Sequence, residues 1–475
     1  MRALLALMIA ASGCGGGAAD DAGADAAVGP RDAGRPDTGV LDAGVPDAAA
    51  ADAGPADARV LDAGQRDAGV DAGAPDAFVP APIAERDGPG AAVASSPVSP
   101  ACLERTYGGP GYEQFQDLAV LADGALLGGT TTATLGSYLD AWLIRLDATG
   151  DVVWSRAIGA AYRDGFQAVR VASDGDLLAA GFSQVGDGRD GGQSAALLVR
   201  VAPSTGLLRW SRRLMPRDAF ARAVDVLETA SGELRVVVNE TEGPSGSWDV
   251  AVWRATAEGT TLGVREIDLG AIDEVCAATE MSDGGLLLVG RSFDTFVDDE
   301  DTFFALRLDA DLREVWRRTY GTNGIGWSAA GERPCGVVRL DGDAAAIATT
   351  DRTDPFAQSR RVFVIAADGS PIRDRVHHVA GDHRVQSIAR AADGQLVVIG
   401  PRIDGSLDFE ADRVDDAGDV RWTASYGGAD WDLPRSLERV ADGSFLVAGE
   451  TYSLRPDSQG WVLRLTDAGA FTCAW

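Results

Sequence analysis

The stretch Asp140-Ala-Trp-Leu-Ile-Arg-Leu-Asp-Ala-Thr-Gly-Asp-Val-Val-Trp154 has the pattern of two short strands joined by a tight turn. Over residues 140–147 the side chains alternate with the period of two that a strand requires. Asp147 and Gly150 supply turn chemistry, because the carboxylate can bond nearby backbone and Gly can adopt a positive φ. Residues 152–154 then resume a β-branched and aromatic strand. The stretch therefore predicts a β-hairpin.

The same pattern returns along the chain, at residues 197–210, 304–316, 415–422 and 461–469. A second landmark is a turn dipeptide, Asp-Gly or Ser-Gly, between two short apolar strands. It occurs at 123–124, 174–175, 231–232, 283–284, 341–342, 393–394 and 442–443. Gly after a short polar residue is a hairpin signal. Seven such units, 49 to 58 residues apart, predict an all-β fold over residues 101–475, a seven-bladed β-propeller of four-stranded blades.

These units resemble bacterial β-propeller repeats that start with Tyr-Gly-Gly, carry a central Asp-Gly and end in Trp-Leu-x-Arg-Leu-Asp. The resemblance covers about residues 102–475. It implies the fold and little about function, since such repeats are mostly uncharacterised. Residues 146–154 also resemble the tryptophan-docking motif of quinoprotein propellers, in which the Trp packs between neighbouring blades. That resemblance implies a structural role for Trp154.

The two ends of the propeller are predicted to meet. Residues 103–109 match residues 316–321, the end of an internal repeat, so the chain begins with the last strand of a blade. Such an overlap closes a propeller ring and hides its open edges. Four cysteines in this region allow three connectivities. In an oxidising compartment we favour Cys102 with Cys473 and Cys276 with Cys335.

The N-terminal 100 residues differ in composition from the rest. Residues 1–13 are a predicted export signal, in which Arg2 precedes an apolar run too short to span a bilayer. Residues 11–14, Ala-Ser-Gly-Cys, resemble the lipobox of bacterial lipoproteins, which implies a lipid anchor on Cys14 and an outer-membrane or cell-surface location. The alternative is an ordinary signal peptide with an incidental Cys. Residues 14–100 are rich in Asp, Ala, Gly and Pro and predict a disordered tether.

Composition excludes several classes of function. The net charge of −30 and the pI near 4.4 argue against nucleic acid as a partner. All 42 basic residues are Arg, which excludes a Walker-type Lys and Schiff-base catalysis. The three histidines lie within residues 377–383, so a Ser-His-Asp triad is confined to that region. We expect a monomer with no catalytic residue set and no cofactor.

An acidic or imidazole side chain recurs about ten residues before each turn landmark. The set is Glu113, Asp164, Asp218, Asp273, Glu332, His383 and Asp432. One interpretation is a ligand mouth, a ring that holds a cation or a positively charged ligand. The other is that each group accepts backbone N–H bonds at the turn between blades, and the repetition favours it. A second recurring acid precedes the third strand and is predicted to fix a turn, at Asp140, Asp249, Asp301 and Asp408.

Two segments contain weak candidates for metal ligands. The densest acidic loop offers Asp294, Asp298, Asp299 and Asp301 to Ca²⁺. The ligand spacing of known calcium loops is absent, so a solvated loop is the favoured interpretation. His377, His378 and His383 are the other candidates, with Asp374 or Asp382. Adjacent histidines on a strand point to opposite faces, which argues against a shared ion.

The favoured functional hypothesis is a lipid-anchored propeller that binds a protein, a peptide or a glycan. Trp327 and Trp431 suit a contact surface or packing between blades. One alternative is an oxidoreductase similar to quinoprotein dehydrogenases. Seven repeats instead of the usual eight and the missing Lys argue against it. The other is a scaffold similar to the propeller lipoprotein of the outer-membrane protein assembly machinery, which has no such tether.

Overall fold

A computed structural model describes the chain from residue 83 to residue 470, with gaps. The described ranges are 83–89, 104–133, 139–160, 162–185, 193–214, 220–241, 248–269, 272–293, 302–320, 335–354, 357–378, 382–403, 407–428, 430–453 and 457–470. All of them belong to one compact unit.

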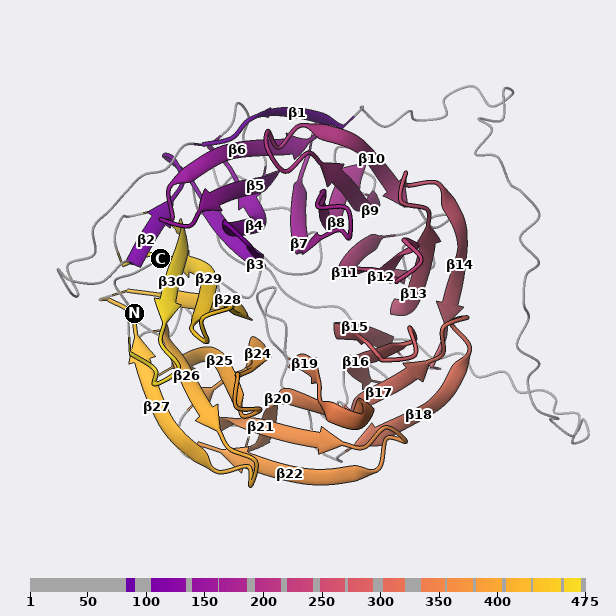
Figure 1. Ribbon diagram of the computed structural model, residues 1–475, viewed down its shortest axis with the longest axis vertical. Helices are drawn as coiled ribbons and strands as arrows, with labels where there is room; N and C mark the ends of the chain where they lie inside the picture. Colours follow the sequence, from indigo (N-terminus) through magenta and orange to yellow (C-terminus); the bar gives the residue numbers. More distant parts are fainter. Residues whose placement is uncertain are drawn as a thin grey trace, which may run out of the picture. The chain divides into compact units, whose positions relative to one another are not determined.

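Seven antiparallel sheets follow one another around a ring (Figure 1). The first three blades are β3 (Glu113–Leu121), β4 (Gly124–Thr131), β5 (Asp140–Asp147) and β6 (Val152–Gly159); β7 (Asp164–Val171), β8 (Leu177–Val185), β9 (Gln193–Val201) and β10 (Leu208–Leu214); and β11 (Ala221–Glu228), β12 (Leu234–Thr241), β13 (Trp248–Ala255) and β14 (Thr261–Ile267). The next two are β15 (Ile272–Glu280), β16 (Leu286–Phe293), β17 (Thr302–Leu308) and β18 (Glu314–Tyr320); and β19 (Cys335–Arg339), β20 (Ala345–Asp354), β21 (Ala357–Ile365) and β22 (Pro371–His377), with the 3-10 turn η1 (Asp341–Asp343) before β20.

The last two blades complete the ring. In blade six β23 (Asp382–His383) and β24 (Ser387–Arg390) share the innermost position and precede β25 (Leu396–Ile403), β26 (Leu407–Val414) and β27 (Val420–Tyr426). Blade seven is β28 (Asp432–Arg439), β29 (Phe445–Thr451), β30 (Gln459–Leu465) and β2 (Glu104–Tyr107). The innermost strand of each blade contacts that of the next, and β28 contacts β3. The predicted seven-bladed propeller of four-stranded blades is confirmed.

The predicted turns lie where the two landmarks placed them. The Asp-Gly and Ser-Gly dipeptides join the first and second strands of each blade, and Gly175 and Gly443 have φ of 89° and 90°. Gly124 is the exception, with φ of 151°. The hairpin predicted over residues 140–154 is formed by β5 and β6, and Gly150 has φ of 78° in its turn. Positive φ at these turns is the reason that Gly recurs there.

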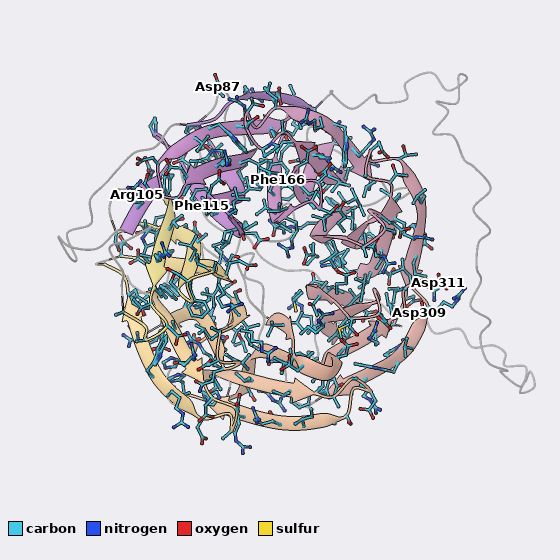
Figure 2. The ribbon with its side chains drawn as sticks, in the orientation of Figure 1. Asp87, Arg105, Phe115, Phe166, Asp309 and Asp311 are labelled. Carbon is cyan, nitrogen blue, oxygen red and sulfur yellow. The ribbon has the colours of Figure 1, made fainter. Side chains whose placement is uncertain are left out.

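Apolar side chains gather between the blades. Seven clusters of buried residues occur in the described part of the chain, and each joins strands of two neighbouring blades. Figure 2 shows Phe115 and Phe166 in the inner part of the ring and Asp87, Asp309 and Asp311 at its rim. Both phenylalanines are fully buried. The core is therefore a set of seven interfaces between blades.

The outer strands of blades one, two and four attach to the next blade by a repeated contact. The indole Nε1 of Trp154 donates to the Pro203 carbonyl at 2.8 Å, in the turn between the third and fourth strands of blade two. Trp316 makes the same bond to Ala367 of blade five at 2.9 Å. Its ring covers Gly369, where a Cβ would lie 2.9 Å from the indole. This geometry agrees with the structural role that the tryptophan-docking resemblance implies.

The ring closes with the N-terminal strand, as the sequence predicts. β2 pairs antiparallel with β30, so it supplies the outermost strand of blade seven. The Tyr107 hydroxyl donates to the Gly150 carbonyl of blade one at 2.8 Å. Arg105 adds an ion pair to Asp151 at 2.7 Å. Side-chain contacts of β2 thus connect the last blade to the first.

One short part of the predicted tether is ordered as a strand. β1 (Ala84–Asp87) pairs antiparallel with β6 as a fifth strand of blade one. Arg86 reaches Asp140 at 3.2 Å, and Glu85 accepts the Leu208 N–H of blade two at 2.5 Å. The prediction of a disordered tether over residues 14–100 is therefore wrong for residues 84–87. The pairing with β6, the ion pair with Asp140 of the same blade and the bond to the backbone of blade two stabilise a segment whose composition is otherwise typical of disorder.

The cysteine pairings stay predictions. Cys276 lies in β15 and Cys335 begins β19, and these innermost strands of adjacent blades contact each other, as the pairing requires. Cys276 is buried, and the side chain of Cys335 is not described. Cys14, Cys102 and Cys473 lie outside the described residues, as do the export signal and most of the tether. Within the described part, no helix is long and apolar enough to cross a membrane.

Candidate functional site

The recurring acids lie where the innermost strands begin. Glu113, Asp164 and Asp432 are the first residues of β3, β7 and β28, and Asp273 is the second of β15. These four side chains are fully buried, and His383, their counterpart in blade six, is 8% exposed. Asp218 and Glu332 lie outside the described residues.

Each carboxylate of this set accepts a backbone bond from the turn that precedes it. The donor is the N–H four residues earlier, at 2.8 Å for Ala160 and Asp164, and at 2.7 Å for Gly428 and Asp432. The same contact occurs at Glu113, with Gly109 at 3.3 Å, and at Asp273, with Leu269 at 3.0 Å. Four blades therefore use the acid to hold the connection between blades, which is the interpretation that the sequence favoured. We base no ligand site on these residues.

The second recurring acid lies beside the first. Asp140 begins β5, and both Asp140 and Asp164 lie close to Gly159. Between blades three and four, oxygens of Asp249, Asp268 and Asp273 lie within 4.8 Å of one another. Arg86 pairs with Asp140, and Arg402 lies 3.7 Å from Asp408. Asp301 and the acidic loop with Asp294, Asp298 and Asp299 lie outside the described residues.

Burial makes these acids sensitive to pH. It raises the pKa of Glu113 to about 7 and that of Asp164 to about 6, although hydrogen bonds from Gly109 and Ser183 act in the opposite direction. Both carboxyls hold a proton more tightly in the folded chain than in the unfolded one. Their contribution to stability is full below the ordinary values of 4.5 and 3.8, and it is lost as the pH rises through about 7 and about 6.

The Glu113→Gln variant tests this dependence. Gln keeps an oxygen for the Thr131 hydroxyl and removes the ionisation. In the wild type we expect Glu113 to lower the free energy of unfolding by up to about 1.4 kcal/mol per pH unit between pH 4.5 and 7. This fall should disappear in Glu113→Gln, and urea unfolding across that range measures it. Asp147→Asn is the control, because bonds from Thr149 lower the pKa of Asp147. An unchanged slope in Glu113→Gln would contradict the prediction.

Two histidines meet two carboxylates between blades five and six. His378 Nε2 lies 2.8 Å from Asp412 Oδ2 and 3.9 Å from Glu410 Oε1. His383 Nδ1 lies 2.8 Å from the same Glu410 oxygen. The imidazole rings are stacked, with centroids 4.5 Å apart and planes 18° apart. We call His378, His383, Glu410 and Asp412 the histidine–carboxylate cluster.

Arg360 of blade five completes the surroundings of the cluster. Its Nη1 lies 2.7 Å from Asp412 and 3.4 Å from Glu410. Its remaining N–H groups donate to three carbonyls, those of Arg384 at 3.0 Å, Gly400 at 2.9 Å and Glu410 at 3.1 Å. The Thr423 hydroxyl donates to Asp412 Oδ1 at 2.6 Å. Arg360 is fully buried, and its bonds to fixed backbone hold both carboxylates in place.

The charges of this region interact strongly. Burial opposes ionisation of Asp412, but bonds from His378 and Arg360 hold the pKa of that carboxyl well below its usual range. The Asp412 carboxylate in turn raises the pKa of His378. His378 also has φ of 59°, in the left-handed region that a non-Gly residue rarely adopts. Strain at a buried charged cluster points to a functional constraint.

The sequence named the histidines but not their acidic partners. Asp374 instead pairs with Arg361 at 2.5 Å, and Asp382 pairs with Arg384 at 3.2 Å. Burial lowers the pKa of His377, which lies outside the cluster. One available signal was the repeat itself, because Glu410 and Asp412 occupy third-strand positions that are apolar in blades one and seven. The equivalents are Trp142 and Ile144 in blade one and Trp461 and Leu463 in blade seven.

A cluster of aromatic side chains lies on the side of the ring where the innermost strands begin. Trp431 and Tyr452 meet edge to face with centroids 6.0 Å apart, and Tyr112 lies 6.4 Å from Tyr452. The Tyr112 hydroxyl donates to Glu450 at 3.1 Å, and Glu450 accepts from Arg435 at 2.7 Å. All three rings are half-buried. Tyr112, Trp431 and Tyr452 are called the aromatic cluster below.

Connections on this side of the ring differ in length. They contain 2 to 14 residues, the longest between β18 and β19, whereas those on the opposite side contain 2 to 6. Variable connections on a rigid scaffold are where binding residues are most often found. Trp327 belongs to the longest connection and lies outside the described residues.

Comparison with known proteins finds similarity among solved structures only. No family model matches the chain, and no curated protein matches it. Among solved structures it is similar to a puromycin hydrolase mutant complexed with PGG, at 17% identity and a TM-score of 0.51, over 78% of this chain and 55% of that one. It is also similar to the β-propeller domain of the Trilobed protease from Pyrococcus furiosus, at 10% identity and a TM-score of 0.43, over 74% and 92% of the two chains.

The chain spans about 55% of the length of that hydrolase. Likeness at such low identity concerns the fold alone, since one fold supports many activities. The seven four-stranded blades of the described residues define the class of protein as a β-propeller.

Proposed function

We propose that this chain is a lipid-anchored binding module of the bacterial envelope or cell surface. The lipobox-like residues 11–14 support an anchor on Cys14, and the composition of residues 14–100 supports a tether. The propeller carries the binding surface, for a protein, a peptide or a glycan. The quinoprotein-like oxidoreductase and the assembly scaffold remain alternatives, and no specific observation favours either.

The observation that carries the binding function is the aromatic cluster. Tyr and Trp are enriched at binding hot spots because they offer large, rigid contact area with a polar tip. The described bond from Tyr112 to Glu450, and the ion pair of Glu450 with Arg435, hold the cluster in place without a ligand. The three rings come from blades one and seven, on the side with variable connections. Such a preorganised platform suits stacking on sugar rings or packing against peptide side chains.

Two substitutions in the aromatic cluster test the binding function. We expect the full chain to bind a component of isolated cell envelopes, or defined glycans and peptides on an array. Trp431→Ala and Tyr452→Ala should each weaken this binding by about tenfold or more, since a truncated hot spot costs about 2 kcal/mol. Val264→Ala, at an exposed rim position in β14, is the matched control and should bind as the wild type does.

Two outcomes count against the binding function. The binding surface is elsewhere if the Trp431 and Tyr452 variants bind as tightly as the control. The binding function fails if the wild type binds no component of the envelope and no probe on the array. Cys14→Ser tests the anchor separately, because this variant should leave the membrane fraction while its binding is unchanged.

A further inference from the structure

We propose that the histidine–carboxylate cluster is a site for one divalent transition-metal ion of the zinc class. The donors are His378 Nε2, His383 Nδ1 and Glu410 Oε1, with Asp412 Oδ2, 2.8 Å from His378 Nε2, as the fourth. The inference is independent of the proposed binding function, because the cluster lies between blades five and six and the aromatic cluster between blades seven and one.

The first support is the convergence of the donors. Ligand atoms of His378, His383 and Glu410 all lie within 4.8 Å of one another. The contacts from His378 to Asp412 and from His383 to Glu410 are both 2.8 Å, and His378 lies 3.9 Å from Glu410. Zinc binds His nitrogen and carboxylate oxygen at about 2.0–2.2 Å, in sites of about four donors. At these bond lengths, the donor atoms of a tetrahedral site lie a little over 3 Å apart. Small shifts of these side chains bring their donor atoms to such separations.

The second support is the composition of the donor set. All three histidines of the chain fall within residues 377–383, and two of them contact neighbouring carboxylates of β26, His378 that of Asp412 and His383 that of Glu410. Two imidazoles with carboxylate oxygens favour zinc and related transition metals over Ca²⁺ or Mg²⁺, which take oxygen ligands. His378 follows the end of β22 with a left-handed backbone, and its ring contacts Asp412 of β26.

The third support is an outer shell that fixes the donors. Metal-ligating side chains are normally held by hydrogen bonds from second residues. Arg360 and Thr423 supply such bonds to Asp412, and the Ser359 hydroxyl donates to the His378 carbonyl at 3.1 Å. Arg360 also balances one of the two carboxylate charges. The His378 side chain is 20% exposed, which gives an ion a path from solvent.

The repeat offers an internal comparison. The interface between blades six and seven is built from the same strand positions and is apolar, with Phe409 and Trp461 edge to face at 6.1 Å. Between blades five and six the equivalent positions hold Arg360 and Glu410. Buried charged groups are often less stabilising than the apolar contact that they replace, and such replacements are typical of functional sites. A bound ion supplies such a function.

Metal titration of the full chain tests the site. After treatment with chelator, the wild type should bind one equivalent of Co²⁺, with the visible absorption of a nitrogen- and oxygen-ligated ion, and Zn²⁺ should displace it. His383→Gln and Glu410→Gln should weaken binding by more than the about 10- to 100-fold that loss of an outer-shell partner costs. His377→Gln is the matched control, since this neighbouring histidine lies outside the cluster. It should bind Co²⁺ as the wild type does.

The outcomes separate the site from a closed hydrogen-bond network. No bound Co²⁺ and no Zn²⁺-dependent rise in the unfolding temperature of the wild type would overturn the proposal. Equal loss of affinity in His377→Gln and His383→Gln would overturn the donor set, as would full affinity in Glu410→Gln. Should Glu410→Gln fail to fold, His378→Gln replaces it, because that side chain is partly exposed. Asp273→Asn should leave the stoichiometry at one, and a drop to zero would place the ion at the acidic junction instead.

Discussion

Tyr107→Ala is expected to lower the free energy of unfolding by about 3–5 kcal/mol, the cost of removing a large buried aromatic side chain. Tyr107 is 1% exposed and packs against Phe115 with centroids 6.1 Å apart. Its hydroxyl also donates to the Gly150 carbonyl. β2 joins the N-terminal part of the propeller to β30 at its C-terminal end. Loss of Tyr107 therefore also weakens the closure of the ring. Urea unfolding of the full chain measures the change.

Tyr320→Ala is the matched control for closure. Tyr320 ends β18 and donates to the Gly369 carbonyl of the next blade at 2.7 Å, as Tyr107 does to Gly150. Tyr320 lies within a continuous blade, so its removal should cost only its own packing and hydrogen bond. We expect Tyr107→Ala to be the more damaging of the two and to expose the segment before residue 113 to proteolysis. Equal effects and an intact segment would show that β2 contributes no more than an ordinary outer strand.

The fold could be predicted from the sequence because its determinants are local. Most turns carry a Gly with positive φ at a fixed place, as at Gly150 and Gly175, and in blade four Leu312 takes that place with φ of 62°. Repetition adds strength, since a pattern that recurs seven times cannot arise from one chance match. Closure was also predictable, because β2 has the sequence of the outer strand that the last repeat lacks.

The missed features depend on partners that are distant in sequence. β1 has a composition typical of disorder, and it is stabilised by β6 and by Asp140, more than fifty residues away. Glu410 and Asp412 are far from the histidines in sequence. The packing of blade five against blade six brings His378 to Asp412, and the sheet of blade six brings His383 to Glu410. Their signal was a departure from the apolar pattern of the repeat. Such departures mark positions where function or a buried network outweighs packing.

Arg360→Met is expected to lower the free energy of unfolding at pH 8 by about 3–5 kcal/mol. The change keeps much of the side-chain volume and removes the guanidinium from Asp412 and Glu410, which are 1% and 2% exposed. Two buried carboxylates then lack their main counter-charge, and three backbone carbonyls lose a donor. Arg313→Met is the control, because its ion pair with Asp311 is exposed and should contribute about 1 kcal/mol or less.

A combined variant separates the charge effect from the loss of packing. In Arg360→Met with Glu410→Met and Asp412→Leu, the interface resembles the apolar contact of blades six and seven. Replacing a buried ionic group with apolar residues of similar volume is often neutral or stabilising. We therefore expect the triple variant to regain most of the stability that Arg360→Met loses. It should also lose the Co²⁺ site, since two donors are gone. If the triple variant is no more stable than the single one, the cost lies in the shape of the Arg360 side chain and not in the uncompensated carboxylates.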